Sequence, residues 1–356
     1  MRLLYEVPRR SCKSGFTILE LLVVISIISM LLALLLPAIQ SAREASRRVL
    51  CMNNLHNIAV AMIGHAEAQR RFPAAAYWGD GSNKTNPGPH HNWVVQLLPM
   101  MDRSDLADRW NFDRLITGST NVDIASVTIS VLICPSDPST VGSGDLSYVL
   151  NGGIGESDYL HGCHDCIVDP FGGLLDLNGN DKVCIGTGIE DGSPSDRDVY
   201  KALGLFFNEN WGYESTPGYK GTHRFHTFAS VFDGLSNTML LSENVKTGAA
   251  LGSNWASCDS RRTKVYFSNE VCKSNSCKVN DFDRNLANSK SQGVNGGIHA
   301  AEGMAPWPSS GHYGGINVSL ADGSVRFVQN DIDGGVYLEL FSTQGSVLSR
   351  TAFADE

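Results

Sequence analysis

An uninterrupted apolar run near the start of the chain limits the possible structures more than any other feature. Residues 21–36 read LLVVISIISMLLALLL, sixteen positions without a charged side chain. Extended to residues 16–39, the run covers 24 positions in which Glu20 is the only charged residue. About 20 apolar residues span the hydrocarbon core of a bilayer as a helix. The run therefore predicts a membrane helix and not the core helix of a water-soluble domain.

A cleaved secretory signal peptide is the alternative interpretation of this run. The apolar part of a signal peptide has about 7–15 residues and ends at a cleavage site of small residues. Here the run is longer, and no A-x-A sequence follows it closely. A retained membrane helix is therefore favoured.

Basic residues lie on both sides of the run. Those before it are opposed by one acid, Glu6, and comprise Arg2, Arg9, Arg10 and Lys13. Those after it are opposed by Glu44 and comprise Arg43, Arg47 and Arg48. Basic flanks prefer the cytoplasmic side, which favours a cytoplasmic N-terminus. Because both flanks are basic, charge alone leaves the orientation open.

The residues directly before the run resemble the processing signal of type IV prepilins. Residues 13–20 read KSGFTILE, a glycine followed by an aromatic residue and a glutamate. In that family a membrane peptidase cuts after the glycine and methylates the new N-terminal phenylalanine. The resemblance implies cleavage between Gly15 and Phe16, an assembly role for Glu20 and a helix kink at Pro37. It also implies a single-pass protein of the bacterial inner membrane with an extracytoplasmic head, whose partners are prepilin peptidase and other pilin-like subunits.

The helix is expected to continue beyond the membrane. Apolar residues recur in steps of three or four, at positions 42, 45, 49, 52, 55, 59, 62 and 66. This spacing places them on one helical face, and Phe72-Pro73 ends the pattern. A helix over 16–69 would be about 80 Å long at 1.5 Å per residue. We therefore expect a leader (1–15), an N-terminal helix that is half membrane-spanning and half amphipathic (16–71), and one head domain (72–356).

The head reads as short strands separated by turns, and one or two short helices are expected over 92–110, broken at Pro99. The candidate strands are 126–133, 146–150, 203–207, 227–232, 238–241, 264–267, 316–320 and 325–328. The last two flank Asp322-Gly323, a strong hairpin signal. The fold class is therefore α+β, with a long N-terminal helix packed on a loop-rich, mainly antiparallel β head, and the prepilin resemblance implies a pilin-like arrangement.

A second resemblance covers most of the chain. His312 followed after nine residues by Asp322-Gly323 resembles the H-x9-D-G motif of a large bacterial family of unsettled role. That family joins a prepilin-type N-terminus to a domain of unknown function. Its other signatures are similar to three segments here, CMNNL from Cys51, CPSD from Cys134 and DGLSNT from Asp233. The resemblance implies an architecture and leaves the activity open.

Cysteine content fits an exported head. The chain has nine cysteines, and removal of Cys12 with the leader leaves eight. An even number in an exported chain favours disulfides, and the candidates are Cys51, Cys134, Cys163, Cys166, Cys184, Cys258, Cys272 and Cys277. We expect Cys51 to pair with Cys134, because the first lies beside the apolar stripe and the second ends an apolar segment that should pack there. The alternative for Cys163 and Cys166, with His161 and Cys184 nearby, is a zinc site.

Other candidate sites are weaker. Asp176, Asn178 and Asn180 alternate as oxygen ligands do in calcium loops, but an ordinary Asn-Gly turn explains the same residues. His312 and Asp322 suggest a base and its orienting acid, yet no G-x-S-x-G sequence supplies a nucleophile. We therefore expect no enzyme and no cofactor, apart from the calcium candidate. A formal net charge of −9 argues against nucleic acid as a partner.

Two main functions remain. The first is a pilin-like or pseudopilin-like subunit of a type IV pilus or type II secretion filament, assembled through its N-terminal helix. The second is a membrane-anchored surface module that binds glycan, protein or a small solute without polymerising. An exported hydrolase is the third and least supported alternative. Recovery in sheared filaments separates the first from the second.

Overall fold

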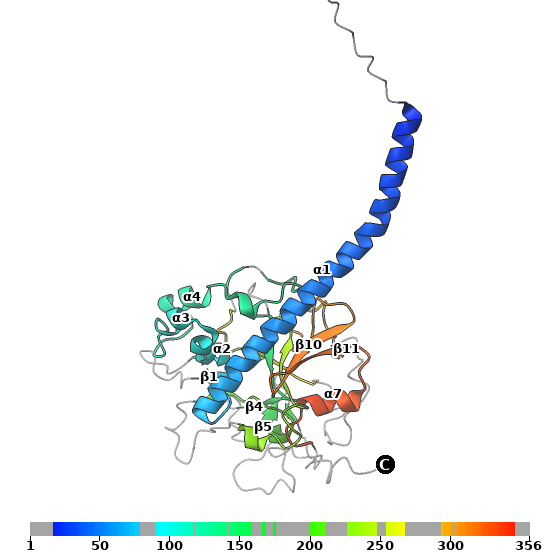
Figure 1. Ribbon diagram of the computed structural model, residues 1–356. Coiled ribbons are helices and arrows are strands. Elements are labelled where there is room, and N and C mark those ends of the chain that lie inside the picture. The colour runs from blue at the N-terminus through cyan, green and yellow to red at the C-terminus, as the bar shows by residue number, and fades with distance from the viewer. Residues whose placement is uncertain are drawn as a thin grey trace, which may run out of the picture. The chain divides into compact units, whose positions relative to one another are not determined.

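The computed structural model describes the backbone of most of the chain (Figure 1). The described residues are 17–78, 90–116, 118–140, 142–158, 166–168, 174–175, 200–210, 226–247, 254–267, 293–301 and 303–345. They form an α+β fold, as the sequence predicts, with one long N-terminal helix and a head built on a mostly antiparallel sheet.

The helix α1 (Ile18–Gln69) has 52 residues and continues through Pro37. The chain divides into two compact units, which meet between Ser46 and Arg47 within this helix. Among the described residues, α1 is the one helix long and apolar enough to cross a membrane. The predicted helix thus exists with nearly the predicted bounds.

Beyond Ser46 one face of α1 belongs to the core of the head. Its buried residues are Cys51, Leu55, Ile58, Ala59, Ala61, Met62, His65 and Ala66. Four of the predicted stripe positions, 55, 59, 62 and 66, are among them. The predicted positions 42, 45 and 49 are exposed, so the buried face begins at Cys51 and is wider than the predicted stripe.

A five-stranded sheet forms the centre of the head, in the order β11-β10-β8-β3-β9. Its strands are β3 (Tyr148–Asn151), β8 (Met239–Glu243), β9 (Lys264–Val265), β10 (Gly315–Leu320) and β11 (Val325–Gln329). All neighbours are antiparallel except β3 and β9. The apolar side chains of β3, β8 and β10 are buried and belong to one core cluster with the buried face of α1.

The β10–β11 hairpin matches its prediction closely. Its turn contains Gly323 with φ +84°, a backbone conformation that side-chain-bearing residues rarely adopt. The carbonyl oxygen of this glycine lies 2.9 Å from Nδ1 of His56 on α1. The guanidinium of Arg48 lies 3.4 Å from the centre of the Phe327 ring. The helix is therefore bound to the hairpin by polar and aromatic contacts as well as by the core.

Two three-stranded sheets are smaller. The first has the order β2-β1-β7 and contains β1 (Ala76–Trp78), β2 (His91–Asn92) and β7 (Glu209–Asn210). The second has the order β4-β5-β6 and contains β4 (Glu156–Asp158), β5 (Cys166–Val168) and β6 (Leu174–Leu175).

Short helices fill much of the connecting chain. They are α2 (Trp93–Leu97), η1 (Leu98–Met101), α3 (Ser104–Ala107), α4 (Ser119–Ala125), η2 (Ser130–Leu132), η4 (Phe228–Ser230), α6 (Ser260–Thr263) and α7 (Gly334–Phe341). The first three correspond to the helices predicted over 92–110, and Pro99 occupies the first turn of η1.

Three predicted strands are wrong. Residues 126–133 directly follow α4 and contain the turn η2, and 227–232 contain the turn η4. Residues 203–207 have no strand pairing, and β7 begins only at Glu209. Residues 203–207 are buried without forming a strand, and the other two segments bury only some of their apolar side chains, since Phe232 is 63% exposed. An apolar run alone does not distinguish such irregular segments from a strand.

Candidate functional site

The first candidate site is the start of α1. Thr17 and Glu20 form a reciprocal cap, because the Thr17 backbone N–H and hydroxyl each donate to Glu20 Oε2 at 2.8 Å. The Glu20 backbone N–H donates to the Thr17 hydroxyl oxygen at 3.2 Å. A capping box of this kind satisfies the donors at a helix start that have no partner within the helix. The carboxylate is thus held at the first turn, and Gly15 and Phe16 lie outside the described residues.

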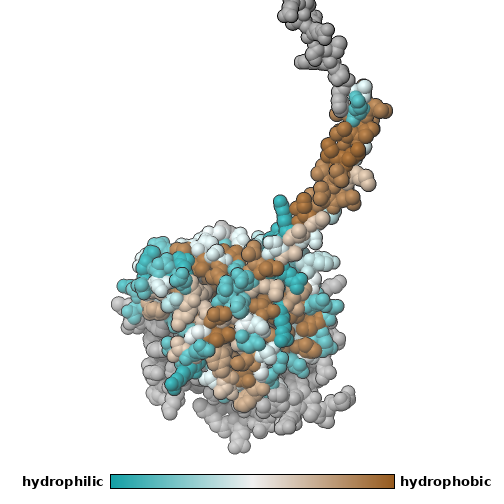
Figure 2. All heavy atoms as spheres, viewed as in Figure 1, coloured by the Kyte–Doolittle hydropathy of each residue, from teal (hydrophilic) through white to brown (hydrophobic). Residues whose placement is uncertain are grey.

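The segment after Glu20 exposes apolar side chains on every face. Leu22 is 59% exposed, Ile28 48% and Leu34 68%. Figure 2 shows this part of the helix as a continuous hydrophobic surface, whereas the visible face of the head is mixed. No part of its most apolar 18-residue window is buried within the protein. Soluble proteins rarely expose an apolar patch larger than a few hundred Å² without a partner or membrane to cover it.

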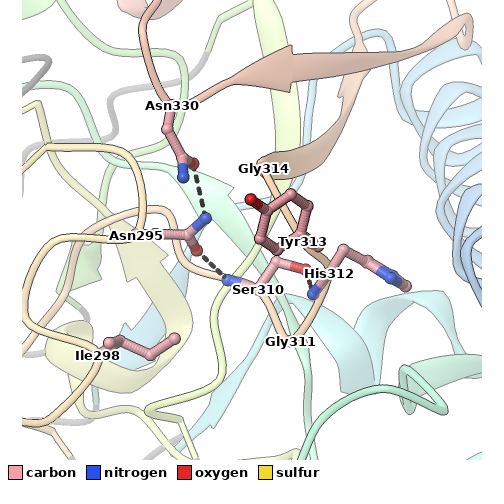
Figure 3. Close-up of a pocket in the computed structure, with 8 residues that line it drawn as sticks. All are labelled: Asn295, Ile298, Ser310, Gly311, His312, Tyr313, Gly314 and Asn330. Carbon is pink, nitrogen blue, oxygen red and sulfur yellow. Dashed lines mark hydrogen bonds between the residues drawn. The ribbon is translucent and has the colours of Figure 1, made fainter. Parts of the chain in front are cut away.

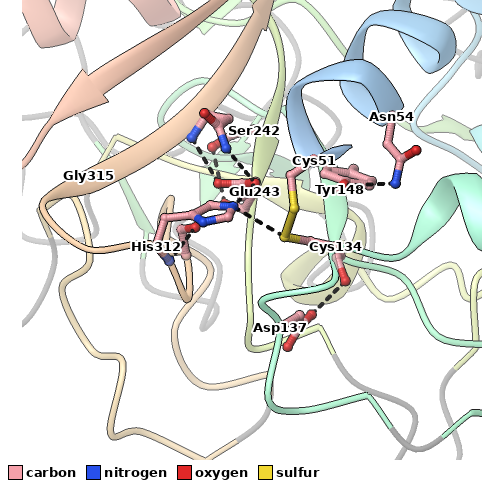
Figure 4. Close-up of polar contacts among 12 residues, drawn as sticks. Cys51, Asn54, Cys134, Asp137, Tyr148, Ser242, Glu243, His312 and Gly315 are labelled. Carbon is pink, nitrogen blue, oxygen red and sulfur yellow. Dashed lines mark hydrogen bonds and ion pairs between the residues drawn. A yellow bond between two sulfur atoms is a disulfide. The ribbon is translucent and has the colours of Figure 1, made fainter. Parts of the chain in front are cut away.

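The second candidate site is a buried cluster where α1 meets the head. Cys51 on α1 and Cys134, two residues after η2, are joined by a disulfide with a Cα–Cα distance of 5.1 Å (Figure 4). The structure therefore contains the pair that the sequence favours. Next to it, Nδ2 of Asn54 donates to the Ile133 carbonyl at 3.0 Å and to the Tyr148 hydroxyl at 3.4 Å. Helix, loop and central sheet meet at this point.

His312 and Glu243 complete the cluster. The Nε2 atom of His312 lies 3.4 Å from Oε1 of Glu243 and 3.5 Å from Sγ of Cys134. Together with Cys51 and Cys134, they make a group of four side chains whose ligand atoms all lie within 4.8 Å of one another. Each of the four residues is buried. Figure 4 shows the imidazole between the carboxylate and the disulfide.

Asn317 on β10 holds the Glu243 carboxylate in place. Its backbone N–H donates to Oε2 at 2.8 Å, and its side-chain Nδ2 donates to Oε1 at 3.0 Å. A buried carboxylate is costly unless it is hydrogen-bonded. The sequence interpretation missed Glu243, although an acid at the end of the apolar strand MLLSE is a signal that could have identified it.

The CPSD segment that carries Cys134 is fixed by its own carboxylate. Asp137 accepts hydrogen bonds from the Ser147 hydroxyl at 2.6 Å and from the Ser139 backbone and hydroxyl at 2.9 and 2.7 Å. Burial raises the pKa of Asp137, although these hydrogen bonds act in the opposite direction. A Cβ atom on Gly311 would overlap the Ser136 carbonyl oxygen. Glycine is therefore needed beside His312 so that the two loops can approach each other.

A pocket of about 480 Å³ lies on the other side of the His312 loop. Its lining residues are Asn295, Ile298, Ser310, Gly311, His312, Tyr313, Gly314 and Asn330. Asn295 donates to Oδ1 of Asn330 at 2.8 Å and accepts from the Ser310 backbone at 2.7 Å. In Figure 3 the imidazole of His312 points away from these two asparagines. Tyr313 is 96% exposed, so the loop presents an aromatic ring outward and an imidazole inward.

The cluster does not have the geometry of a nucleophilic triad. In such a triad the base receives the nucleophile's proton on one ring nitrogen and is oriented by a carboxylate on the other. Here both the sulfur and the carboxylate lie against Nε2 of His312. Asp322, the orienting acid considered from the sequence, instead accepts from the backbone and hydroxyl of Ser324 at 2.9 and 2.6 Å. It shapes the hairpin turn.

The remaining candidate cysteines have different outcomes. Cys258 is a buried free thiol, so its expected disulfide is wrong. Its sulfur donates to the Tyr77 carbonyl at 3.8 Å, and burial raises its pKa to about 12, which makes it an unreactive thiol. Cys166 begins β5. Four cysteines and the calcium candidates lie outside the described residues, namely Cys163, Cys184, Cys272, Cys277, Asp176, Asn178 and Asn180.

Comparison with known proteins gives two matches, one for each candidate site. A family model described as a prokaryotic N-terminal methylation motif matches residues 10–36. A second, described as a protein of unknown function (DUF1559), matches residues 40–335. No curated protein and no solved structure matches the chain. The first match includes Gly15, Phe16 and Glu20, and the second includes all four residues of the buried cluster. Both family resemblances inferred from the sequence are confirmed.

Proposed function

Since this chain belongs to the family described as a protein of unknown function (DUF1559) and carries the N-terminal methylation motif, we propose that it is a pilin-like or pseudopilin-like structural subunit. In this proposal, prepilin peptidase cuts between Gly15 and Phe16. The apolar half of α1 anchors the protein in the inner membrane with the head on the outer side. Subunits then associate through this half of the helix.

One observation carries the proposal: an apolar helix with all faces exposed begins with a single carboxylate. An acidic side chain at the centre of a membrane helix costs about 2.5–3.5 kcal/mol on insertion scales, and less near the interface. Cleavage would create a positively charged amine at Phe16. In the single chain Glu20 accepts from Thr17. In an assembly its carboxylate would bind the amine of a neighbouring subunit and so fix the axial offset between helices.

The test is the substitution Glu20→Ala, with Glu67→Ala as its matched control. Both remove an exposed carboxylate from α1, but Glu67 lies at the far end of the helix, in the head. We expect Glu20→Ala to insert in the membrane and be cleaved, yet to be absent or strongly reduced in sheared filaments. Glu67→Ala should assemble normally. Recovery of mature Glu20→Ala protein in filaments at the wild-type yield would remove the assembly role.

The pocket beside Tyr313 favours a second candidate function, a membrane-anchored binding module. Its rim combines a fully exposed aromatic ring with amide side chains, and aromatic and amide groups together suit sugars or small polar solutes. Two results would favour this module. The protein would be found in membranes but not in sheared filaments, and it would bind a ligand that the Tyr313→Ala variant does not bind. If Glu20→Ala abolishes filaments and the wild-type protein binds no ligand, the binding module is excluded and the filament subunit is favoured.

A further inference from the structure

The two cysteines of the disulfide and the two buried side chains beside it match the ligand set of a metal site. We propose that Cys51, Cys134, Glu243 and His312 bind Zn²⁺ when a dithiol reduces the Cys51–Cys134 bridge, and that reoxidation of the bridge expels the ion. The proposal does not depend on filament assembly, because every ligand lies in the head and in the part of α1 that belongs to it.

The distances already present support this site. Zinc bonds of about 2.0–2.3 Å in a tetrahedron place neighbouring ligand atoms about 3.3–3.8 Å apart. The Nε2 atom of His312 lies 3.4 Å from Oε1 of Glu243 and 3.5 Å from Sγ of Cys134. Two ligand pairs are thus at tetrahedral spacing without any movement. Once the bridge is reduced, the sulfur of Cys51, which already lies within 4.8 Å of the other ligand atoms, becomes available as the fourth ligand.

The chemistry of the ligands favours zinc over harder cations. Two thiolates, an imidazole and a carboxylate are ligands that Zn²⁺ accepts in four-coordinate sites, whereas Ca²⁺ and Mg²⁺ prefer oxygen alone. Metal-bound carboxylates are usually held by further hydrogen bonds. Asn317 supplies two of these to Glu243. The ligands also come from four separate segments, so a bound ion would join α1 to the head as the disulfide does.

Charge balance allows the exchange in a buried place. In thiol–disulfide exchange the dithiol gives two electrons and two protons to the bridge, and becomes a disulfide itself. The two new thiols lose their protons to water as Zn²⁺ binds. One divalent cation and two thiolates add no net charge, so the site keeps the charge that it has with the disulfide. Without the metal, two buried thiolates beside Glu243 would be strongly unfavourable.

Metal titration of the full-length protein in detergent is the first test. The protein is stripped with a chelator, reduced with dithiothreitol and freed of the reductant by anaerobic gel filtration. We expect reduced protein to bind Co²⁺ with the visible absorption of a tetrahedral thiolate site, and Zn²⁺ to displace it. Diamide, a two-electron thiol oxidant, should release the ion. Identical Co²⁺ spectra before and after reduction would overturn the proposal.

The reductant also reduces other cysteines, which could bind the metal themselves. Substitutions of the two ligands that are not cysteines therefore show whether the metal is bound at this cluster. We expect His312→Gln and Glu243→Gln to weaken Zn²⁺ binding by at least about 100-fold, more than the loss of an outer hydrogen bond does. Cys258→Ser and the double variant Cys163→Ser/Cys166→Ser are the matched controls and should bind normally. Loss of binding in the controls but not in His312→Gln would assign the metal elsewhere and overturn the proposal.

A measurement on the wild-type chain covers the case in which the variants do not fold. Zinc X-ray absorption of the reduced protein reports the ligand atoms directly. We expect two sulfur and two nitrogen or oxygen neighbours. A shell of three or four sulfurs, or no bound zinc, would refute the assignment to these four residues.

Discussion

The first part of helix α1 exposes its apolar side chains, whereas the second part buries one face of them in the head. Before Ser46, leucine, isoleucine and valine side chains are 45–84% exposed around the helix, at positions such as Val24, Ile28 and Leu34. After it, Leu55, Ile58 and Met62 are completely buried. The backbone is helical throughout. The same helix therefore lies in two environments: its first part has no protein partner in the single chain, and its second part packs in the core of the head.

The comparison shows that helix length and burial carry separate information. An amphipathic face explains why the second part packs on the head. An apolar surface on all sides requires lipid or other subunits around the first part. Substitutions in the two parts should consequently affect different properties, membrane anchoring and processing in one and stability of the head in the other.

The largest expected effect concerns processing and leaves the head unchanged. Replacing Gly15 with leucine should block cleavage completely, since the family peptidase cuts after glycine. Intact mass of protein purified from membranes should then show the full-length chain without N-methylation. Thermal unfolding of the head should equal the wild type. Normal cleavage of this variant would contradict the prepilin assignment.

Removing the disulfide should give the largest loss of stability in the head. The bridge closes a loop with a sequence separation of 83 residues. In the chain-entropy model this stabilises the folded head by about 4–5 kcal/mol. The double variant Cys51→Ala/Cys134→Ala should lose this amount in denaturant unfolding followed by tryptophan fluorescence. Cys258→Ala removes a buried thiol that forms no bridge, and a loss of similar size there would show that the entropic term is not the cause.

A matched pair of leucine substitutions tests the comparison directly. Leu55 is completely buried, whereas Leu22 is 59% exposed. Leu55→Ala should destabilise the head by about 2–5 kcal/mol through lost burial and the cavity that it leaves. Leu22→Ala should leave the stability of the head unchanged. Chemical denaturation of both variants in the same detergent checks this, and equal losses would mean that the two parts of α1 do not differ as described.

The smallest expected effect is a loss of stability of the head in acid, caused by its buried histidines. Burial lowers the pKa of His226 to about 4 from 6.5. The unfolded chain therefore binds more protons than the folded one between about pH 6.5 and 4, and stability falls as the pH decreases through that range. One such group contributes on the order of 1–3 kcal/mol at pH 4.

The substitution His226→Gln should reduce this dependence on pH. Unfolding free energies measured from pH 7 to pH 4 should fall less steeply in the variant, while stability near pH 7 should decrease slightly because the contacts of His226 with Ser230 and Lys201 change. The matched control is His299→Gln, which changes an exposed imidazole. An unchanged slope in His226→Gln would assign the acid sensitivity to other groups.

Local patterns predicted the parts of the fold that local physics determines. The long helix follows from the apolar run and the spacing after it, and the β10–β11 hairpin follows from Asp322-Gly323 between alternating residues. The strands predicted at 126–133 and 227–232 were wrong because these segments form the short turns η2 and η4 instead. In the first segment, contacts such as the hydrogen bond from Trp255 Nε1 to the Val127 carbonyl at 2.8 Å replace strand pairing. Those partners are far away in sequence.

The buried cluster was only partly predictable for the same reason. Cys51 and Cys134 could be paired from their apolar surroundings, and His312 stood out within a family signature. Glu243 did not, because its importance depends on contacts with residues about 70 positions away, His312 and Asn317. Sequence reasoning finds chemically conspicuous residues, whereas the juxtaposition of ordinary ones comes from the packing of the sheet.

The position of the disulfide also determines how the protein would respond to mechanical force. Cys51 is the first buried residue of α1, so tension applied along the helix reaches a covalent bond before it reaches the core residues that follow. The load passes directly from Cys51 to Cys134, and the 83-residue separation between them is removed from the length that can be pulled out. At about 3.3–3.6 Å per extended residue, reduction would release roughly 280 Å of hidden chain. A protein held by its N-terminal helix would therefore bear tension while the α1 side of its core stays folded.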